Sequence, residues 1–101
     1  MNIRHKFNAQ RTELDGIKFS SKREAQYYQE LQFAVKSGDL LFFLRQVPLH
    51  LPGGVRYCID FVEFWKNDEV RFVDTKGFRT PMYIAKKKMV EALYPIKILE
   101  V

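Results

Sequence analysis

Two acidic residues and a lysine near one end of a predicted sheet carry the chemistry that this sequence offers. In the segment VRFVDTKG, strand alternation places Asp74 and Lys76 on one face, about 6.6 Å apart along the strand. An ordinary strand-end salt bridge would explain this pair alone, because a carboxylate and an ammonium on an apolar strand are unfavourable unless paired or used. Asp60 adds a second carboxylate, since it interrupts the apolar segment VRYCIDFVEFW, which a short turn joins to the Asp74 segment.

The loop between these two segments decides whether Asp60 and Asp74 can act together. Because side chains alternate between faces, Asp60 lies opposite Asp74 only if the loop has an odd number of residues, for example with Phe64 opposite Val70. An even loop turns the two acids to opposite faces unless a β-bulge restores their alignment. A joint site therefore predicts an odd loop or a bulge.

A divalent metal ion would resolve the repulsion between Asp60 and Asp74. Two carboxylates a few ångströms apart would each be partly protonated without a cation. Mg²⁺ prefers one or two carboxylates together with waters and phosphate oxygens, and it makes its bound water more acidic. Lys76 would orient or deprotonate the attacking water, or stabilise charge in the transition state. The set therefore indicates metal-assisted attack of water on a phosphodiester.

Glu24 is the candidate third carboxylate. It lies in line with Tyr28 and Leu31 in a predicted helix, at the N-terminal end of the stripe that faces inward. The alternative is a capping box, in which the Glu24 side chain folds back onto the backbone N–H of Ser21 for structural reasons. Both interpretations remain open from the sequence.

A hairpin and a helix precede these acidic segments. Asp15-Gly16 supplies the positive φ angles of a tight turn between two short extended segments. The helix is expected over residues 21–37, because Ser21 is a good N-cap and Gly38 is a natural stop. The strand-like segments LLFFLRQVPLHL, VRYCIDFVEFW and EVRFVDTKG follow, and their turn residues predict an antiparallel meander.

A second helix and a last strand close the chain. Thr80-Pro81 opens the helix, which runs to about Leu93. Its buried stripe is expected to be Met82, Ala85, Met89, Ala92 and Leu93. The segment IKILEV then forms the final strand, reached by a helical crossover. This order predicts an α/β sandwich in which helices flank a central mixed sheet.

Composition narrows the class of protein. The 101 residues are 47% hydrophobic, which supports one packed core and excludes wholesale disorder. The net charge of +5 favours a polyanionic partner, nucleic acid before a membrane surface. A single cysteine, Cys58, and the lack of a signal peptide or apolar span predict a cytoplasmic protein with no membrane partner. His5, His50 and Cys58 lack metal-ligand spacing and receive no role.

The segments LDGIKFSSKREAQYYQEL, YCIDFVEF and FVDTKGFRT resemble the PD-(D/E)XK nuclease superfamily. They are most similar to a phage-borne family of small nuclease-like proteins related to archaeal-type Holliday junction resolvases. The resemblance implies a three-layer restriction-endonuclease-like sandwich, with residues 1–101 as one nuclease domain and residues 1–10 as a flexible arm. Two positions depart from the pattern: Ile59 stands where the superfamily name has Pro, and Asp74 where resolvases more often have Glu.

The resemblance also implies the site and the partners. It makes Asp60, Asp74 and Glu24 the metal-binding acids and Lys76 the catalytic lysine, with Mg²⁺ or Mn²⁺ as the cofactor. The implied activity is hydrolysis of phosphodiesters in branched DNA such as four-way junctions, in the host cytoplasm for a phage-borne chain. Since a resolvase cuts two strands symmetrically, one site per chain implies a homodimer, for which the apolar residues 40–44 would suit an interface if one face is exposed.

Basic and polar residues near the site are the expected phosphate contacts. They flank the two helices and the first long strand, and they are Lys22, Arg23, Gln46, Arg79, Thr80, Lys86 and Lys87. The plainer interpretation of the lysines is a solvated helix face, with Glu91 pairing with Lys87 or Lys88.

Other functions stay open. A nonspecific or sequence-directed nicking endonuclease of the same superfamily would cleave matched linear duplex. A DNA-binding protein without catalysis would bind with a steep salt dependence and need no divalent cation. A protein-binding phage accessory factor would do neither.

Overall fold

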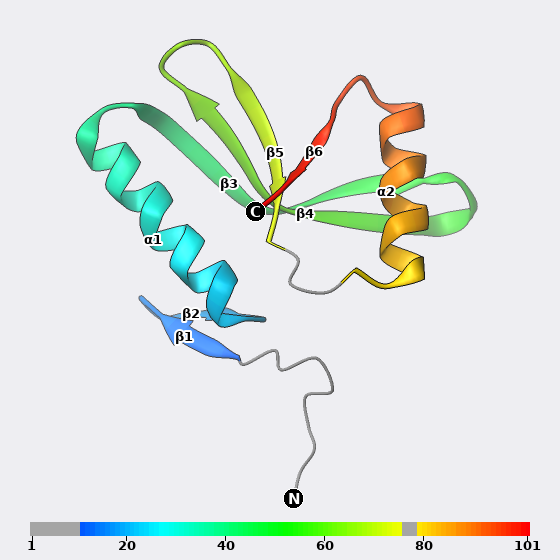
Figure 1. Cartoon of the computed structure of the whole chain (residues 1–101), viewed down its shortest axis with the longest axis horizontal. Coiled ribbons are helices and arrows are strands. Elements are labelled where there is room, and N and C mark those ends of the chain that lie inside the picture. The colour runs from blue at the N-terminus through cyan, green and yellow to red at the C-terminus, as the bar shows by residue number, and fades with distance from the viewer. Residues whose placement is uncertain (1–10, 76–78) are drawn as a thin grey trace, which may run out of the picture.

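The computed structural model describes residues 11–75 and 79–101, and it places a mixed four-stranded sheet between two helices (Figure 1). The elements are β1 (Thr12–Leu14), β2 (Ile17–Phe19), α1 (Lys22–Ser37), β3 (Leu40–Leu51), the short 3-10 turn η1 (Pro52–Gly54), β4 (Val55–Trp65), β5 (Val70–Asp74), α2 (Pro81–Leu93) and β6 (Ile98–Glu100). The sheet order is β3-β4-β5-β6, in which only β5 and β6 pair in parallel. The α/β class and the mixed sheet predicted from the sequence are confirmed.

The helix α1 begins and ends where its caps predict. Ser21 is the N-cap, and its hydroxyl accepts a hydrogen bond from the Glu24 backbone N–H at 3.1 Å. Gly38 ends the helix with a φ of 89°, a left-handed conformation that glycine adopts without a steric penalty. The inward face buries Glu24, Ala25, Tyr28 and Leu31, so Glu24 lies on the buried stripe as expected. No helix in the described ranges is long and apolar enough to cross a membrane.

The helix α2 has the expected start but a different buried face. Thr80 caps it by accepting a hydrogen bond from the Tyr83 backbone N–H at 3.0 Å, and Pro81 occupies the first turn. The predicted stripe is wrong: Met82 is 66% exposed and Leu93 is 54% exposed, whereas Tyr83 and Val90 are buried. The aromatic Tyr83 determines which way the helix faces, because its ring carries more apolar surface than a methionine and its hydroxyl finds a partner.

Two hydrophobic clusters occupy the two sides of the sheet. The cluster on the α1 side holds Phe19, Ala25, Tyr28, Leu31, Leu40, Phe61 and Val73. The cluster on the α2 side holds Leu51, Tyr57, Ile59, Val62, Tyr83, Val90 and Ile98. Each helix therefore buries its apolar face against a different side of the same sheet, which is the arrangement of an α/β sandwich.

The long β3–β4 hairpin changes sides half-way along. Arg45 stacks on the α1-side residue Phe19, whereas Val47 packs into the α2-side cluster, although residues two apart on a regular strand share a face. The same change of side occurs on β4, where Ile59 packs into the α2-side cluster and Phe61 into the α1-side cluster. Gln46 lies between the first pair with a φ of 50°, a left-handed conformation that costs a non-glycine residue about 1–2 kcal/mol. Figure 1 shows the result: the far end of the hairpin passes behind α2 in this view.

The β4–β5 hairpin settles the register on which the joint site depends. Phe64 pairs with Val70 and Phe61 with Val73, so the next position along the ladder sets Asp60 opposite Asp74. The Asp60 backbone N–H donates to Asp74 Oδ1 at 2.9 Å. The predicted odd loop is therefore confirmed.

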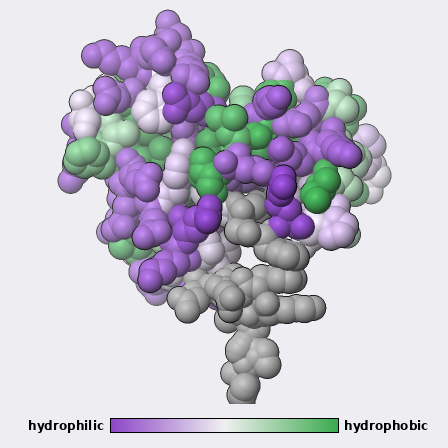
Figure 2. Space-filling model, viewed as in Figure 1, coloured by the Kyte–Doolittle hydropathy of each residue, from purple (hydrophilic) through white to green (hydrophobic). Residues whose placement is uncertain are grey.

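The visible face of the molecule is mostly hydrophilic, with hydrophobic residues in small separate groups (Figure 2). One strand is an exception, because it carries several exposed apolar side chains. On the edge strand β3, Leu41 is 58% exposed, Phe42 49% and Leu44 47%. The condition that the sequence set for an interface at residues 40–44, an exposed apolar face, is met by these three side chains.

Candidate functional site

An open hollow of ≈ 620 Å³ lies where the hairpin changes sides, and residues from both halves of the molecule line it. Glu24 and Asp60 contribute acidic groups to its wall, and Lys18, Arg45, Arg56 and Lys86 contribute basic groups. A hollow with two carboxylates ringed by cations has the charges needed to hold a metal ion and a phosphate side by side.

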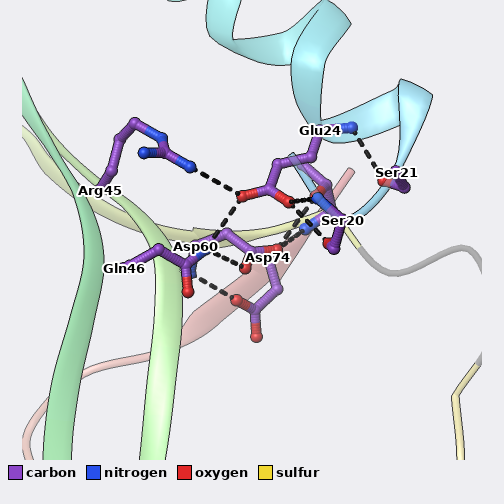
Figure 3. Close-up of polar contacts among 8 residues, drawn as sticks. Ser20, Ser21, Glu24, Arg45, Gln46, Asp60 and Asp74 are labelled. Atoms are coloured by element: carbon purple, nitrogen blue, oxygen red, sulfur yellow. Dashed lines mark hydrogen bonds and ion pairs between the residues drawn. The ribbon is translucent and has the colours of Figure 1, made fainter. Parts of the chain in front are cut away.

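Glu24 points from the first turn of α1 into this hollow (Figure 3). Only half of the predicted capping box forms, because the Glu24 carboxylate does not turn back to Ser21. Its Oε1 accepts from the Ser20 hydroxyl at 2.8 Å, and its Oε2 accepts from the Gln46 amide at 2.9 Å. Glu24 is 1% exposed, so a buried carboxylate is held by one donor from Ser20, just before α1, and by one from Gln46 on β3. This geometry favours the site interpretation of Glu24 over the capping one.

Asp60 lies opposite Gln46 on the neighbouring strand and is 7% exposed. Its Oδ1 accepts from the Gln46 amide at 3.1 Å. Its Oδ2 accepts from the Thr75 backbone N–H at 2.9 Å and from the Thr75 hydroxyl at 3.0 Å. The inversion on β4 turns this acid toward the hollow, while the end of β5 fixes one of its oxygens.

Asp74 is fully buried next to Asp60. Its Oδ1 accepts from the Asp60 backbone N–H, and its Oδ2 accepts from the Tyr57 hydroxyl. Burial, together with this bond to a carboxylate, raises the pKa of the Tyr57 phenol well above its usual value. Tyr57 therefore stays a protonated donor to Asp74 at every physiological pH.

Arg45 contributes a positive charge to the wall of the hollow. Its guanidinium lies 4.5 Å from the centre of the Phe19 ring, and one of its nitrogens is 3.6 Å from Glu24 Oε2. Among the described residues, the buried Arg45 Nε finds no hydrogen-bond partner. Such a stacked guanidinium is held rigidly, since the aromatic face and the carboxylate both attract the cation.

Within residues 11–75 and 79–101, no three His, Cys, Asp or Glu side chains form a ready-made metal cage. The donor set nevertheless suits a hard divalent cation, because Glu24 Oε2 and Asp60 Oδ1 both bond to a single nitrogen, that of the Gln46 amide. Two oxygens from different elements thus converge on one point at the rim of the hollow. Lys76, the predicted catalytic lysine, lies outside the described residues.

The predicted phosphate contacts divide into two groups. Gln46, Thr80 and Lys86 line the hollow. Lys22 and Arg23 lie elsewhere: they line a second, smaller hollow beside the C-terminal residue, whose carbonyl accepts from Arg23 at 2.7 Å.

Arg79 and Lys87 are engaged with an acid of β6. Their nitrogens lie 3.1 and 3.8 Å from the Glu100 carboxylate. That carboxylate also accepts from the Tyr83 hydroxyl at 2.9 Å, so it links the start of α2 to the last strand.

Sequence reasoning missed eight residues that line the hollow: Lys18, Ser20, Arg45, Arg56, Tyr57, Cys58, Met82 and Tyr83. Ser20, Arg56 and Tyr57 had a signal, since each lies three or four positions from a predicted acid. Arg45 had none, because only the change of side on the hairpin brings it there.

The chain belongs to the family described as "Protein of unknown function (DUF1064)", which it matches over residues 4–99. No curated protein and no solved structure gives a significant match to it. Membership of this family assigns no activity, so the case for a function rests on the residues.

Proposed function

We propose that this protein is a divalent-metal-dependent endodeoxyribonuclease that hydrolyses phosphodiester bonds in branched DNA, as a Holliday junction resolvase of phage origin. The observation that carries the proposal is the convergence of Glu24 and Asp60 on one point, with Asp74 directly behind them in register. Three acids from three separate elements are brought together although their burial is unfavourable, and such an arrangement is typical of a functional site.

The finer fold assignment is part of the proposal. A helix, a three-stranded antiparallel meander, a second helix and a strand parallel to the third form the order expected for a restriction-endonuclease-like core of the PD-(D/E)XK superfamily. In that fold the acid of the second meander strand and the D-x-K motif of the third meet at one strand end. Asp60 on β4 and Asp74 on β5 occupy those positions.

Each residue has a distinct task in this mechanism. A bound Mg²⁺ or Mn²⁺ would supply a more acidic water and neutralise charge on the phosphate. Glu24 and Asp60 would hold it, and Asp74, fixed by Tyr57, would complete its acidic surroundings. Lys76 would orient or deprotonate the attacking water. Arg45 and Lys86, on the wall of the hollow, would hold phosphate oxygens of the DNA backbone.

Branched DNA is the substrate in this proposal because the described residues of the hollow offer cations and hydroxyls that can contact phosphates. Such phosphate contacts recognise the position of the backbone and carry no sequence information. An enzyme of this kind selects its substrate by the shape of the phosphate backbone. A four-way junction presents such a shape.

The test is cleavage of an immobile four-way junction beside a matched linear duplex, with Mg²⁺, Mn²⁺ or EDTA. We expect paired symmetric nicks in the junction alone, abolished by EDTA and by Asp60→Asn or Asp74→Ala. The matched control is Asp68→Asn, which removes a carboxylate from the exposed β4–β5 turn, where asparagine tolerates the φ of 71°.

Other results of this test assign other functions. Cleavage of the linear duplex would identify a nicking endonuclease of the same superfamily. Binding without cleavage, unaffected by EDTA, would identify a non-catalytic DNA-binding protein and refute the nuclease proposal.

A homodimer belongs to the same proposal. A resolvase needs two sites related by a twofold axis, and each chain supplies one. The exposed apolar side chains of β3 lie on an edge of the sheet, where a second copy could cover them.

A further inference from the structure

Gln46 lies between two buried carboxylates, those of Glu24 and Asp60. Its left-handed backbone sits at the point where β3 changes sides. Unlike the acids beside it, Gln46 is exposed, so its amide stands at the mouth of the hollow. A strained conformation persists only where the surroundings over-determine it, and here it delivers one amide to two buried carboxylates.

The amide nitrogen of Gln46 bridges these two acids (Figure 3). One nitrogen, Nε2, lies 2.9 Å from Glu24 Oε2 and 3.1 Å from Asp60 Oδ1, and its two hydrogens suffice for one bond to each. Both acceptors are carboxylate oxygens, and an ionised carboxylate makes stronger hydrogen bonds than a neutral acceptor. The nitrogen therefore stands at the point on which the two carboxylate oxygens converge.

We propose that Gln46 is a cation-responsive ligand: it bridges Glu24 and Asp60 through Nε2 without a divalent cation and turns its amide to present Oε1 when one binds. This inference rests on the proposed metal site and adds a neutral oxygen donor to it. The donor NH₂ group and a cation compete for the same two carboxylate oxygens, so both cannot face the acids at once. A half-turn of the amide removes the competing donor and supplies an oxygen of the kind that Mg²⁺ accepts.

The first test observes the wild-type protein directly. The side-chain NH₂ protons of Gln46, identified by their loss in Gln46→Glu, are followed by NMR during titration with Mg²⁺ alone. We expect their resonances to shift and their exchange with water to become faster, because both hydrogen bonds to the carboxylates are released. Gln32 is the matched internal control, since its amide donates to the Tyr28 hydroxyl at 2.8 Å, away from both acids. Unchanged Gln46 protons in a cation-saturated protein would overturn the inference.

The second test measures the affinity for Mg²⁺ by calorimetry, without DNA. Gln46→Met keeps the length of the side chain but removes its carbonyl, and we expect it to weaken Mg²⁺ binding by about tenfold or more. Gln46→Glu restores an oxygen at the same place and should bind at least as tightly as the wild type. Gln32→Met should leave the affinity unchanged. If Gln46→Met binds Mg²⁺ as tightly as the wild type, or more tightly, the Gln46 amide only competes with the cation for the two carboxylates. The inference is then wrong.

Asp60→Asn separates failure of this inference from failure of the proposed function. If Asp60→Asn abolishes Mg²⁺ binding and neither Gln46 variant alters it, the ligand role of Gln46 is refuted. The proposed metal site then remains supported. Wild-type protein that binds no Mg²⁺ at all would refute both. Should Gln46→Met fail to fold, the NMR titration of the wild type and the affinity of Gln46→Glu still decide the question.

Discussion

At the scale of single residues, the buried acids differ in how fully their neighbours bind them. Asp74 has a donor on each oxygen, one of them the Tyr57 phenol, whereas Glu24 and Asp60 direct one oxygen each toward the exposed amide of Gln46. A cation can displace an exposed amide more easily than a buried phenol. In the proposed site, Asp74 would therefore be the fixed acid, and the two other acids would be the accessible ligands.

Tyr57→Phe tests the role of the phenol as a positioning group for Asp74. The variant leaves Asp74 Oδ2 without this donor, and losing such a second contact at a metal site costs about 10–100-fold in affinity or activity. We expect the cleavage rate to fall by that factor and the Mg²⁺ concentration for half-maximal cleavage to rise. Tyr94→Phe is the matched control, because the Tyr94 hydroxyl donates only to the His50 carbonyl on an exposed contact. A lower melting temperature with an unchanged Mg²⁺ requirement would show a purely structural role.

A second prediction at this scale concerns alkaline pH. Burial is the main cause that raises the pKa of Tyr27, Tyr57 and Tyr83 above the ordinary value of 10.0. The folded protein thus keeps these protons where the unfolded chain releases them, so stability falls as the pH rises above about 10. Phenolate absorbance should show that these three tyrosines resist titration until the protein unfolds. Their titration at the ordinary pKa, with the fold intact, would contradict this.

At the scale of elements, α1 is fixed to the sheet by a further buried acid, Glu63, which has no part in the site. Glu63 is fully buried on β4 and accepts from the Tyr27 hydroxyl at 2.5 Å and from the Trp65 indole at 2.9 Å. Burial raises the pKa of Glu63, although both hydrogen bonds oppose that rise. The Tyr27 bond joins α1 to β4 and so helps to hold Glu24 over the hollow.

Tyr27→Phe should therefore destabilise the fold more than it disturbs the site. It leaves Glu63 Oε2 without this donor, and an unsatisfied buried acceptor costs about 1–3 kcal/mol in the free energy of unfolding. Urea unfolding of the variant checks this value, with Tyr94→Phe again as the exposed control. Equal stability of the two variants would mean that the Tyr27 bond contributes nothing net.

The elements were predictable from the sequence because their signals are local. Ser21, Gly38 and Thr80-Pro81 set the helix ends through caps that any chain would use. The pairing of Asp60 with Asp74 followed from the parity of one short loop. The metal site and the activity remain predictions.

The change of side on the β3–β4 hairpin could not be predicted, since it depends on tertiary packing. In β4 both alternating faces are apolar, so a switch between Ile59 and Phe61 leaves no trace in the pattern. The buried face of α2 was misjudged for a related reason. Its methionines and its aromatic residues fit helical spacing equally well, and only the partners available to Tyr83 decide between them.

At the scale of the whole molecule, the proposed function would use two surfaces. The basic groups around the two buried acids of the hollow would attract DNA toward those acids, in keeping with the net charge of +5. The exposed apolar side chains of Leu41, Phe42 and Leu44 lie on the edge strand β3. This edge would bind the second copy of the chain.

Leu44→Lys tests the dimer at this edge. A lysine on an edge strand prevents strand-to-strand association because its charge would be buried in the interface. We expect the wild type to sediment as a dimer and the variant as a monomer that still binds Mg²⁺ but makes unpaired single nicks in a four-way junction. Leu93→Lys is the control, since Leu93 is 54% exposed at the end of α2, on another element than the proposed interface. A Leu44→Lys protein that stays dimeric would place the interface elsewhere, whereas a wild-type monomer that makes paired nicks would show that one chain can act twice on the same junction.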